Sequence, residues 1–379
     1  MSGPASVLMI DSESTWRGGE AQLELLIRGL LAEGGFAVTL AAPPDSAIAA
    51  RAGAMGVTCL PLRVAGGMDL AAAWKLRGYL RTNRYDIVHC HSSHAHSVAS
   101  LAMKRPFGRG RGTRRRLVVS RRVDFPIATN LFSTAKYRAG VDAYLAISNG
   151  VREVLEEGGV EGDRITLVRS GIDLDKFARV RNIDYLYDEF GMSGQTPVIG
   201  NIAALAPHKS QADFIRAAES IAKQLSGARF FVVGEGELRG ELEELIRDLK
   251  LEGDVVLTGF REDVLELLSM FDCFVLSSSL EGLCTSIMDA QTMGVPVVAT
   301  RTGGVPDLVE DGVTGLLVTP GRPDLLAEAV VRMMTEPGLK ESCAAAATSR
   351  AESYDYRRMV SGTVDVYHRL LEHNQGGGR

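Results

Sequence analysis

The sequence contains little of what a membrane-spanning, secreted or metal-binding protein needs. No apolar run approaches the roughly 20 residues that a transmembrane helix requires. Asp11 and Glu13 follow the first apolar run at once, which argues against a signal peptide. The five cysteines are odd in number, scattered and without metal-ligand spacing. Such cysteines are expected to be reduced thiols in a cytoplasm.

The length and charge of the chain indicate two domains of different character. Its 379 residues suffice for two full cores, and a hydrophobic content of 45% with 23% charged residues is typical of a globular protein. Residues 1–173 hold 22 Lys/Arg and 16 Asp/Glu, a net charge of +6. Residues 174–379 hold 20 and 31, a net charge of −11, and the two sum to the −5 of the whole chain. The halves are therefore expected to have different partners.

Short apolar runs alternate with amphipathic helical segments, which predicts parallel sheets of the Rossmann-like α/β class. In the first half the predicted strands are Val7–Ile10, Val38–Ala42, Val57–Leu60, Ile87–His89, Leu117–Ser120 and, as the last, Val141–Ile147. A second domain opens near Pro197 with a strand that feeds a proline-initiated helix.

The stretch Cys273–Thr300 organises the second domain. Its residues predict a buried strand, a polar turn containing Glu281, a helix carrying Asp289, and a further strand. A helix start at the carboxyl edge of a parallel sheet suits a phosphate or diphosphate. Glu281 and Asp289 are eight residues apart and are expected to face the same crevice. The alternative is a helix-capping acid and a solvated acid.

Other turns offer weaker signals of the same kind. Gly18 and Gly19 follow the first strand and would let the backbone approach a ligand closely, although an ordinary strand-to-helix turn is the alternative. Lys209 stands near a predicted helix start, where a solvated lysine is the alternative. The turn at Gly234 has the setting of a dinucleotide fingerprint, but Arg239 occupies the position where that motif needs glycine.

Metal sites are not expected from the sequence. His89, His91, His94 and His96 lie close together after a strand, but the break from strand to helix separates them and no acidic or cysteine ligands accompany them. His89 is expected to pack in the sheet, whereas His91 and His94 are better placed for a cleft. Asp173-Leu-Asp175 has a D-x-D pattern, but we expect it to cap a linker.

Taken in order, these motifs resemble the retaining GT-B glycosyltransferases of family 4. Glu281-Gly282 followed by Asp289 resembles the E-x7-E motif of that family, with Asp in the second position. Gly18-Gly19 resembles its donor-phosphate loop, and Lys209 matches its diphosphate lysine. The resemblance implies two Rossmann-like parallel-sheet domains that face each other across a cleft. These would be an acceptor-side domain at 1–175, joined by a C-terminal helix at 354–373, and a nucleotide-sugar domain at 190–353.

The resemblance also implies roles for individual residues. Glu281 and Lys209 would be catalytic, together with His91 or His94, because Arg121-Arg122 stands where the family often has a histidine. The implied donor-binding residues are Gly18, Gly19, Asn201, Gly234, Phe260, Arg261, Gly282, Leu283 and Asp289. No cofactor or metal is expected, since the nucleotide-sugar is a substrate.

The function that follows is retaining transfer of a sugar from a nucleotide-diphosphate sugar to an acceptor, a lipid-linked or cell-envelope glycan. Two alternatives stay open at this point. One is a nucleotide-sugar epimerase of the same fold, which would release a free epimer instead of a transfer product. The other is a non-catalytic nucleotide-sugar binder, which would release no nucleoside diphosphate.

The segment from Lys104 to Arg122 holds nine Lys/Arg and no acid. Its acceptor-side or membrane-facing candidates are Arg114, Arg115, Arg116, Arg121 and Arg122. A solvated loop is one alternative; nucleic acid is disfavoured because Phe107 is its one aromatic residue. We therefore predict a cytoplasmic enzyme that binds peripherally to the anionic inner face of the plasma membrane.

Overall fold

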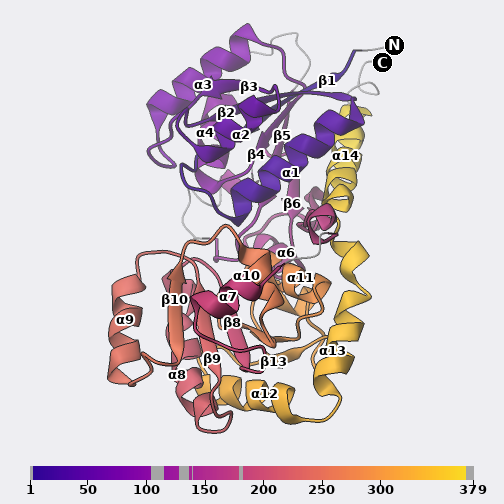
Figure 1. Cartoon of the computed structure of the whole chain (residues 1–379). Helices are drawn as coiled ribbons and strands as arrows, with labels where there is room; N and C mark the ends of the chain where they lie inside the picture. The colour runs from indigo at the N-terminus through magenta and orange to yellow at the C-terminus, as the bar shows by residue number, and fades with distance from the viewer. Residues whose placement is uncertain (1–2, 104–114, 128–135, 139, 179–181, 373–379) are drawn as a thin grey trace. The chain divides into compact units, whose positions relative to one another are not determined.

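The computed structural model describes residues 3–103, 115–127, 136–138, 140–178 and 182–372 (Figure 1). The chain divides into two compact units, each built on its own sheet. Unit 1 comprises Met1–Gly171 and Tyr356–Arg379, and unit 2 comprises Ile172–Asp355. Among the described residues, no helix is both long enough and apolar enough to cross a bilayer.

Unit 1 is a parallel sheet in the strand order β3-β2-β1-β4-β5-β6-β7. Its described strands are β1 (Ala5–Ile10), β2 (Phe36–Ala42), β3 (Thr58–Pro61), β4 (Ile87–Cys90), β5 (Arg116–Arg121), β6 (Ala143–Ala146) and β7 (Ile165–Leu167). Its described helices are α1 (Gly18–Glu33), α2 (Ala47–Ala54), α3 (Leu70–Thr82), α4 (Ser93–Met103), α6 (Asn149–Glu157) and α14 (Tyr356–Glu372).

Helices cover both faces of the unit 1 sheet. Helices α1, α2 and α14 pack over one face, and α3 and α4 pack together over the other (Figure 1). Close approach of α1 to α14 requires a glycine, because a Cβ on Gly29 would lie 2.3 Å from Cγ2 of Val360. Helix α14 begins at Tyr356, two residues later than expected, because a 3₁₀ turn at Ala351–Tyr354 precedes it.

The last strand of unit 1 was not expected. Strand β7 follows β6 and pairs with it in parallel, so the prediction that the sheet ends at Val141–Ile147 was wrong. Three residues at a sheet edge are too few to show a periodic apolar pattern.

Unit 2 is also a parallel sheet, in the order β10-β9-β8-β11-β12-β13. Its strands are β8 (Val198–Ile202), β9 (Arg229–Val233), β10 (Val255–Gly259), β11 (Cys273–Leu276), β12 (Val297–Thr300) and β13 (Leu316–Val318). Its α-helices are α7 (Asp184–Glu189), α8 (Gln211–Ala222), α9 (Arg239–Asp248), α10 (Val264–Ser269), α11 (Thr285–Thr292), α12 (Pro323–Thr335) and α13 (Leu339–Thr348). Short 3₁₀ helices occur at Leu174–Phe177, Pro207–Lys209 and Val305–Asp307.

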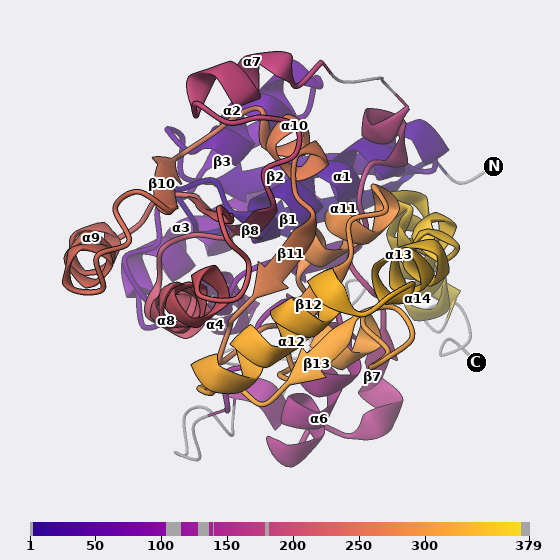
Figure 2. The same cartoon turned by 60° about the horizontal axis from the view of Figure 1, so that its bottom comes forward.

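Helices α8 and α12 lie side by side on one face of the unit 2 sheet (Figure 2). Phe214 and Ile221 of α8 and Val330 of α12 are fully buried in this core. The core fixes β8 and β11, and therefore the loops that leave them.

The strand order fixes where each unit can bind a ligand. In unit 1 the order reverses between β1 and β4, and in unit 2 between β8 and β11. Open parallel sheets bind ligands outside the carboxyl ends of the strands at such a switch point. The loops that follow β1, β4, β8 and β11 are therefore the places to look for a site. Together the two sheets confirm the expected α/β class.

Candidate active site

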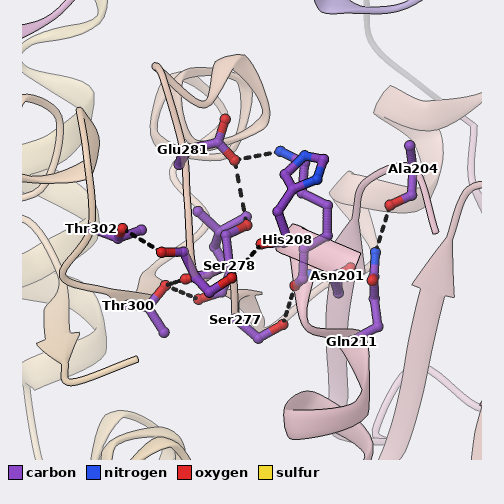
Figure 3. A network of polar contacts seen from close by, with 12 residues as sticks. Asn201, Ala204, His208, Gln211, Ser277, Ser278, Glu281, Thr300 and Thr302 are labelled. Atoms are coloured by element: carbon purple, nitrogen blue, oxygen red, sulfur yellow. Dashed lines mark hydrogen bonds and ion pairs between the residues drawn. The ribbon is translucent and has the colours of Figure 1, made fainter. Parts of the chain in front are cut away.

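A lysine and a glutamate meet at the switch point of unit 2. Lys209 ends the 3₁₀ turn after β8, and Glu281 lies in the loop after β11. The Nζ of Lys209 donates to Oε2 of Glu281 at 2.5 Å, and the two side chains are only 17% and 9% exposed. The γ-hydroxyl of Ser278 also donates to this oxygen, at 3.4 Å (Figure 3). An ion pair this little exposed is held in a defined geometry.

The two loops that carry this pair hold each other in place. The carbonyl oxygen of His208 accepts from the backbone N–H of Ser279 at 2.8 Å and from its hydroxyl at 3.2 Å. The hydroxyl of Ser277 donates to the carbonyl oxygen of Lys209 at 3.0 Å. Because these bonds join the carboxyl ends of β8 and β11, the positions of Lys209 and Glu281 are coupled (Figure 3).

Strand β12 supports the Glu281 loop from its other side. The hydroxyl of Thr300 donates to the carbonyl oxygen of Ser278 at 2.5 Å, and that of Thr302 to the carbonyl oxygen of Ser279 at 2.8 Å (Figure 3). The backbone N–H of Gly304 donates to the carbonyl oxygen of Glu281 at 2.9 Å. The loop is thus rigid and needs little reorganisation to bind a ligand.

The expected proline-initiated helix at Lys209 is corrected by the structure. Pro207 starts a 3₁₀ turn, and α8 begins only at Gln211. Between them Ser210 has a positive φ of 49°. The chain turns sharply at this residue, so Lys209 lies before the helix. A propensity argument sees the proline but not the turn that follows it.

Helix α11 starts just after the Glu281 loop. Gly282 and Leu283 lie buried in that loop, and the N-cap residue Cys284 makes no side-chain hydrogen bond to the first turn. The helix therefore begins two residues after Leu283. A helix start without a side-chain cap can donate its N–H groups to an anion.

Asp289 lies in α11 and is partly buried. Burial raises the pKa of its carboxyl to about 7, and the positive charge of Lys176 acts against this rise. Asp289 is one turn into the helix. A carboxyl with a pKa near 7 is half ionised at neutral pH, so a ligand that needs the charge would bind in a pH-dependent way.

Two of the expected donor residues serve the sheet itself. Asn201 is fully buried, and its side-chain amide donates to the carbonyl oxygen of Val275 in β11 at 2.8 Å. The side chain therefore ties β8 to β11. Gly234 has a φ of 141°, and a Cβ there would lie 2.1 Å from the carbonyl oxygen of Ala203. Close packing of the loop after β9 against the loop after β8 thus requires this glycine.

The loop after β10 carries Phe260 and Arg261. Phe260 is 69% exposed. Arg261 instead donates two hydrogen bonds to Glu189 and two to Asp263, at 2.6 to 3.0 Å. These bonds raise the pKa of Arg261 and lower that of Asp263 to about 2. The guanidinium therefore ties α7 to this loop, and Phe260 is the side chain left facing outwards.

In unit 1, Gly18 and Gly19 open helix α1 at the switch point. Neither has a positive φ, and a Cβ on Gly18 would meet nothing within 4 Å. A Cβ on Gly19 would meet only Cδ of Arg122, at 3.9 Å. Neither backbone strain nor packing requires glycine here. The glycines instead leave open space beside the helix start.

A cluster of ionisable residues lies beside these glycines. Asp11 follows β1, Glu20 lies in the first turn of α1, and Arg122 follows β5. Asp11 is 2% exposed and Glu20 is 5% exposed. Burial, reinforced by the charges of Glu20 and Glu13, raises the pKa of Asp11 to about 7. Burial also raises the pKa of Glu20 and lowers that of Arg122 to about 10.

We did not identify Asp11 or Glu20 as site residues from the sequence. The available signal was an acid directly after the first apolar run and another after the glycine pair. The hydrogen bond from the backbone N–H of Arg17 to Oε2 of Glu20, at 2.8 Å, is a helix-capping contact, so one role of Glu20 is local.

The two candidate histidines occupy different environments. His91 follows β4 and is 7% exposed, and neither ring nitrogen has a hydrogen-bond partner among the described residues. Burial, then the neighbouring His89 and Arg122, hold its pKa well below the usual range. It is therefore neutral at pH 7. His94 is exposed in the first turn of α4.

His89 is packed in the sheet, as expected. Its Nδ1 lies 2.6 Å from the hydroxyl of Tyr367 in α14, and its Nε2 lies 2.8 Å from the hydroxyl of Ser120 in β5. Burial lowers its pKa to about 3. Its ring is 4.1 Å from that of His91 between centroids, so it also positions that ring.

The described arginines of the basic segment do not form the exposed face that we expected. Arg116 pairs with Asp142 at 3.1 Å, and Arg115 donates to the carbonyl oxygen of Leu80. Arg121 is 8% exposed and donates to Tyr137 and Phe125. The guanidinium of Arg122 contacts Ser170 at 3.5 Å. Arg114 and the rest of 104–114 lie outside the described residues.

No group of three or more His, Cys, Asp or Glu side chains within the described ranges could hold a metal ion. In Asp173-Leu-Asp175, the first carboxylate accepts from the backbone N–H of the second aspartate at 3.3 Å. This contact caps the 3₁₀ turn Leu174–Phe177.

Comparisons with known proteins match both halves of the chain to glycosyltransferase families. Residues 16–176 match the family "Glycosyltransferase Family 4", and residues 187–350 match "Glycosyl transferases group 1". The chain is 25% identical over 317 residues to the N-acetyl-alpha-D-glucosaminyl L-malate synthase of Bacillus anthracis, covering 82% of this chain and 81% of that protein. It is 26% identical over 269 residues to the UDP-Gal:alpha-D-GlcNAc-diphosphoundecaprenol alpha-1,3-galactosyltransferase of Escherichia coli, covering 66% of each.

Solved structures share the fold over nearly the whole chain. HepE from Anabaena, crystallised with UDP and glucose, matches with a TM-score of 0.81 at 20% identity, covering 96% of this chain and all of that one. A glycosyltransferase from Rickettsia africae matches with a TM-score of 0.83 at 17% identity, covering 98% and 99%. The two family matches together span both units. The chain is an enzyme of the group 1, family 4 glycosyltransferases, with the GT-B fold.

Proposed function

We propose that this glycosyltransferase moves a sugar from a nucleotide-diphosphate sugar to an acceptor hydroxyl, with retention of configuration at the anomeric carbon. The Lys209–Glu281 pair at the unit 2 switch point carries the proposal. It places a cation and a carboxylate side by side next to an uncapped helix start. In a nucleotide sugar, the diphosphate can bind the cation and the sugar hydroxyls can donate hydrogen bonds to the carboxylate.

Each group has a task when the anomeric C–O bond breaks. The departing diphosphate gains negative charge, which Lys209 and the N–H groups at the start of α11 would stabilise. The sugar gains positive charge, which Glu281 would face while it holds the sugar hydroxyls. The acceptor oxygen forms the new bond to the anomeric carbon, and its proton passes to the departing phosphate oxygen. Arrival and departure on one face retain the configuration.

Unit 1 also offers groups that suit a nucleotide sugar. Gly18 and Gly19 leave space through which their backbone can approach the donor phosphates. Asp289 would hold the ribose from α11. Neutral His91 could accept or donate a hydrogen bond to a sugar or acceptor hydroxyl, because both its ring nitrogens lack partners among the described residues.

The relatives suggest which substrates to test first. HepE was crystallised with UDP and glucose, and the E. coli relative is named for a UDP-galactose donor and a diphosphoundecaprenol-linked acceptor. We therefore propose a UDP-sugar as donor and a lipid-linked or cell-envelope glycan as acceptor.

Turnover with a panel of UDP-, GDP- and ADP-sugars tests the proposal. We expect nucleoside diphosphate release that depends on an acceptor, and an α-linked product from an α-linked donor by NMR. Inversion at the anomeric carbon would overturn the retaining mechanism. Release of a free 2-epimer would indicate the epimerase, and binding without nucleoside diphosphate release would indicate a non-catalytic binder.

A further inference from the structure

The outward face of helix α3 in unit 1 exposes an unusual amount of apolar surface. Met68, Leu70 and Trp74 are 68%, 63% and 74% exposed. Within the described ranges, only one other large apolar side chain, Phe260, is more than 60% exposed. We call Met68, Leu70 and Trp74 together with the cations Lys75, Arg81 and Arg84 the α3 outer face.

The exposure of this face is not a result of poor packing. The inner side of α3 buries Ala72, Leu76 and Leu80 against unit 1. The carboxylate of Asp69 accepts from the backbone N–H of Ala72 at 2.9 Å and so caps the start of the helix. A well-anchored helix therefore presents apolar side chains outward. Three large apolar side chains this exposed within seven residues of sequence indicate an interaction site.

The second tryptophan of the chain shows the contrast. Trp16 is half-buried against the unit 1 core and lies under the guanidinium of Arg51, 4.2 Å from its carbon to the ring centroid. Trp74 is almost fully in water. Tryptophan gains from a boundary where its ring is apolar and its N–H remains hydrated.

Positive charge accompanies this apolar surface. Residues 68–86, which carry this face, hold four Lys/Arg and two acids, the helix-capping Asp69 and Asp86, a net charge of +2, although the whole chain has a net charge of −5. Lys75, Arg81 and Arg84 are exposed, and none of them forms an ion pair with a described residue. Arg81 follows Trp74 by seven residues, which places both on the same side of the helix. The occupant of this face must therefore be both apolar and anionic.

We propose that the α3 outer face docks the protein on the surface of an anionic lipid bilayer. Helix α3 would lie in the interfacial plane, with Met68, Leu70 and Trp74 at the boundary of the acyl chains and the cations among the headgroups. Each cation near such a surface strengthens binding roughly fivefold, the equivalent of about 1 kcal/mol. This proposal does not rest on the donor chemistry proposed above.

Trp74 itself reports the docking. In a Trp16→Phe variant, Trp74 is the only tryptophan of the chain. We expect its emission to shift to the blue and to be quenched by brominated acyl chains when vesicles of phosphatidylglycerol mixed with phosphatidylcholine are added. Vesicles of phosphatidylcholine alone should produce a much smaller shift.

Substitutions distinguish vesicle binding by this face from nonspecific binding by the rest of the protein. Lys75→Glu with Arg81→Glu should weaken co-sedimentation with the anionic vesicles at least tenfold, and Met68→Ser with Leu70→Ser should weaken it severalfold. The matched control is Arg247→Glu with Lys250→Glu, an equal reversal of exposed charge in unit 2. It should bind like the wild type. Unchanged thermal unfolding temperatures would show that the variants are folded.

Three outcomes would overturn the proposal. One is the absence of a Trp74 shift with anionic vesicles. A second is a shift that appears on raising the protein concentration without lipid, which would identify a second copy of the chain as the occupant. The third is wild-type vesicle binding by the Lys75→Glu, Arg81→Glu variant but lost binding after Arg109→Glu with Arg111→Glu.

Discussion

The two units share a topology but differ in the charges at their switch points. In unit 2 the loops after β8 and β11 bring opposite charges together, Lys209 and Glu281. In unit 1 the segments after β1 and at the start of α1 bring three carboxyls together, Asp11, Glu20 and Glu13, beside one cation, Arg122. The fold thus decides where polar side chains gather, whereas the residues decide whether their charges match.

This difference has opposite energetic consequences. Removing one partner of a matched pair leaves an uncompensated charge in a poorly solvated place. Crowded buried carboxyls instead favour their neutral form, as the pKa of about 7 for Asp11 indicates. The stability of unit 1 should therefore depend on pH.

The largest effect should come from Asp11→Asn, which removes a titrating group from unit 1. The folded pKa of about 7 lies above the 3.8 of the free side chain. Below pH 4 Asp11 is protonated in both the folded and the unfolded state and does not lower the free energy of unfolding. As the pH rises towards 7, the buried carboxyl increasingly lowers it. Three pKa units correspond to about 4 kcal/mol. The variant should lose this pH dependence. The difference between its free energy of unfolding and that of the wild type should therefore grow, in favour of the variant, from pH 4 to pH 8.

Urea unfolding across this pH range measures the difference. Asp45→Asn is the control, because Asp45 is an exposed carboxylate of unit 1 that pairs with Arg63. Its curve should run parallel to that of the wild type. Parallel curves for Asp11→Asn as well would show that Asp11 is ionised in the folded protein.

Next in size is Lys209→Ala, which breaks the matched pair of unit 2. Loss of a preorganised charge at the departing diphosphate should lower turnover about a hundredfold. Lys223→Ala is the control, because Lys223 pairs with Glu219 at 2.8 Å with its side chain 70% exposed. Steady-state kinetics of both variants check this. Equal turnover in the Lys209 variant and the wild type would leave Lys209 a structural partner of Glu281 only.

Much of the fold could be predicted because buried parallel strands leave a strong local signal. The continuous apolar runs at Val7–Ile10 and Phe274–Leu276 are typical of strands in a parallel sheet that is covered on both faces. Strand β7 and the 3₁₀ turn at Lys209 escaped prediction for local reasons. The first is too short to show a period, and the second depends on the positive φ of Ser210, which no propensity predicts.

The site was harder to predict because charge partners are remote in sequence. The sequence around Arg116 and Arg121 suggests one basic patch. In the structure, however, Arg116 forms an ion pair with Asp142 and Arg121 donates a hydrogen bond to Tyr137. Arg122 lies near Asp11, more than a hundred positions earlier in the chain. The ion pair of Lys209 with Glu281 likewise joins two loops, and the sequence suggested each residue separately.

Asp289→Asn tests a carboxyl of unit 2 whose pKa burial raises to about 7. If the ionised carboxyl holds the ribose, the variant should bind donor roughly tenfold to a hundredfold more weakly at pH 8, as for loss of a charge-assisted hydrogen bond. Since burial raises the pKa of Asp289 to about 7, wild-type affinity should increase as the pH rises through 7. The variant should lack this increase.

Isothermal titration with UDP at pH 6 and pH 8 measures both effects. Asp307→Asn is a suitable control for general charge loss, because Asp307 lies in a separate 3₁₀ turn of the same unit. Equal UDP affinity in wild type and Asp289→Asn at pH 8 would exclude a ribose contact.

The smallest change is Gly19→Ala, which tests whether the open space of unit 1 has a use. The φ of Gly19 is not positive, and the new methyl group would meet only Arg122 Cδ at 3.9 Å. The variant should therefore fold normally, with an unfolding free energy equal to that of the wild type or up to about 1 kcal/mol higher. If the backbone must approach the donor phosphates, KM for the donor should still rise severalfold. Gly53→Ala in α2 also meets nothing within 4 Å and lies away from the glycine pair, so it should change neither quantity. An unchanged KM in Gly19→Ala would make the glycine pair an ordinary strand-to-helix turn.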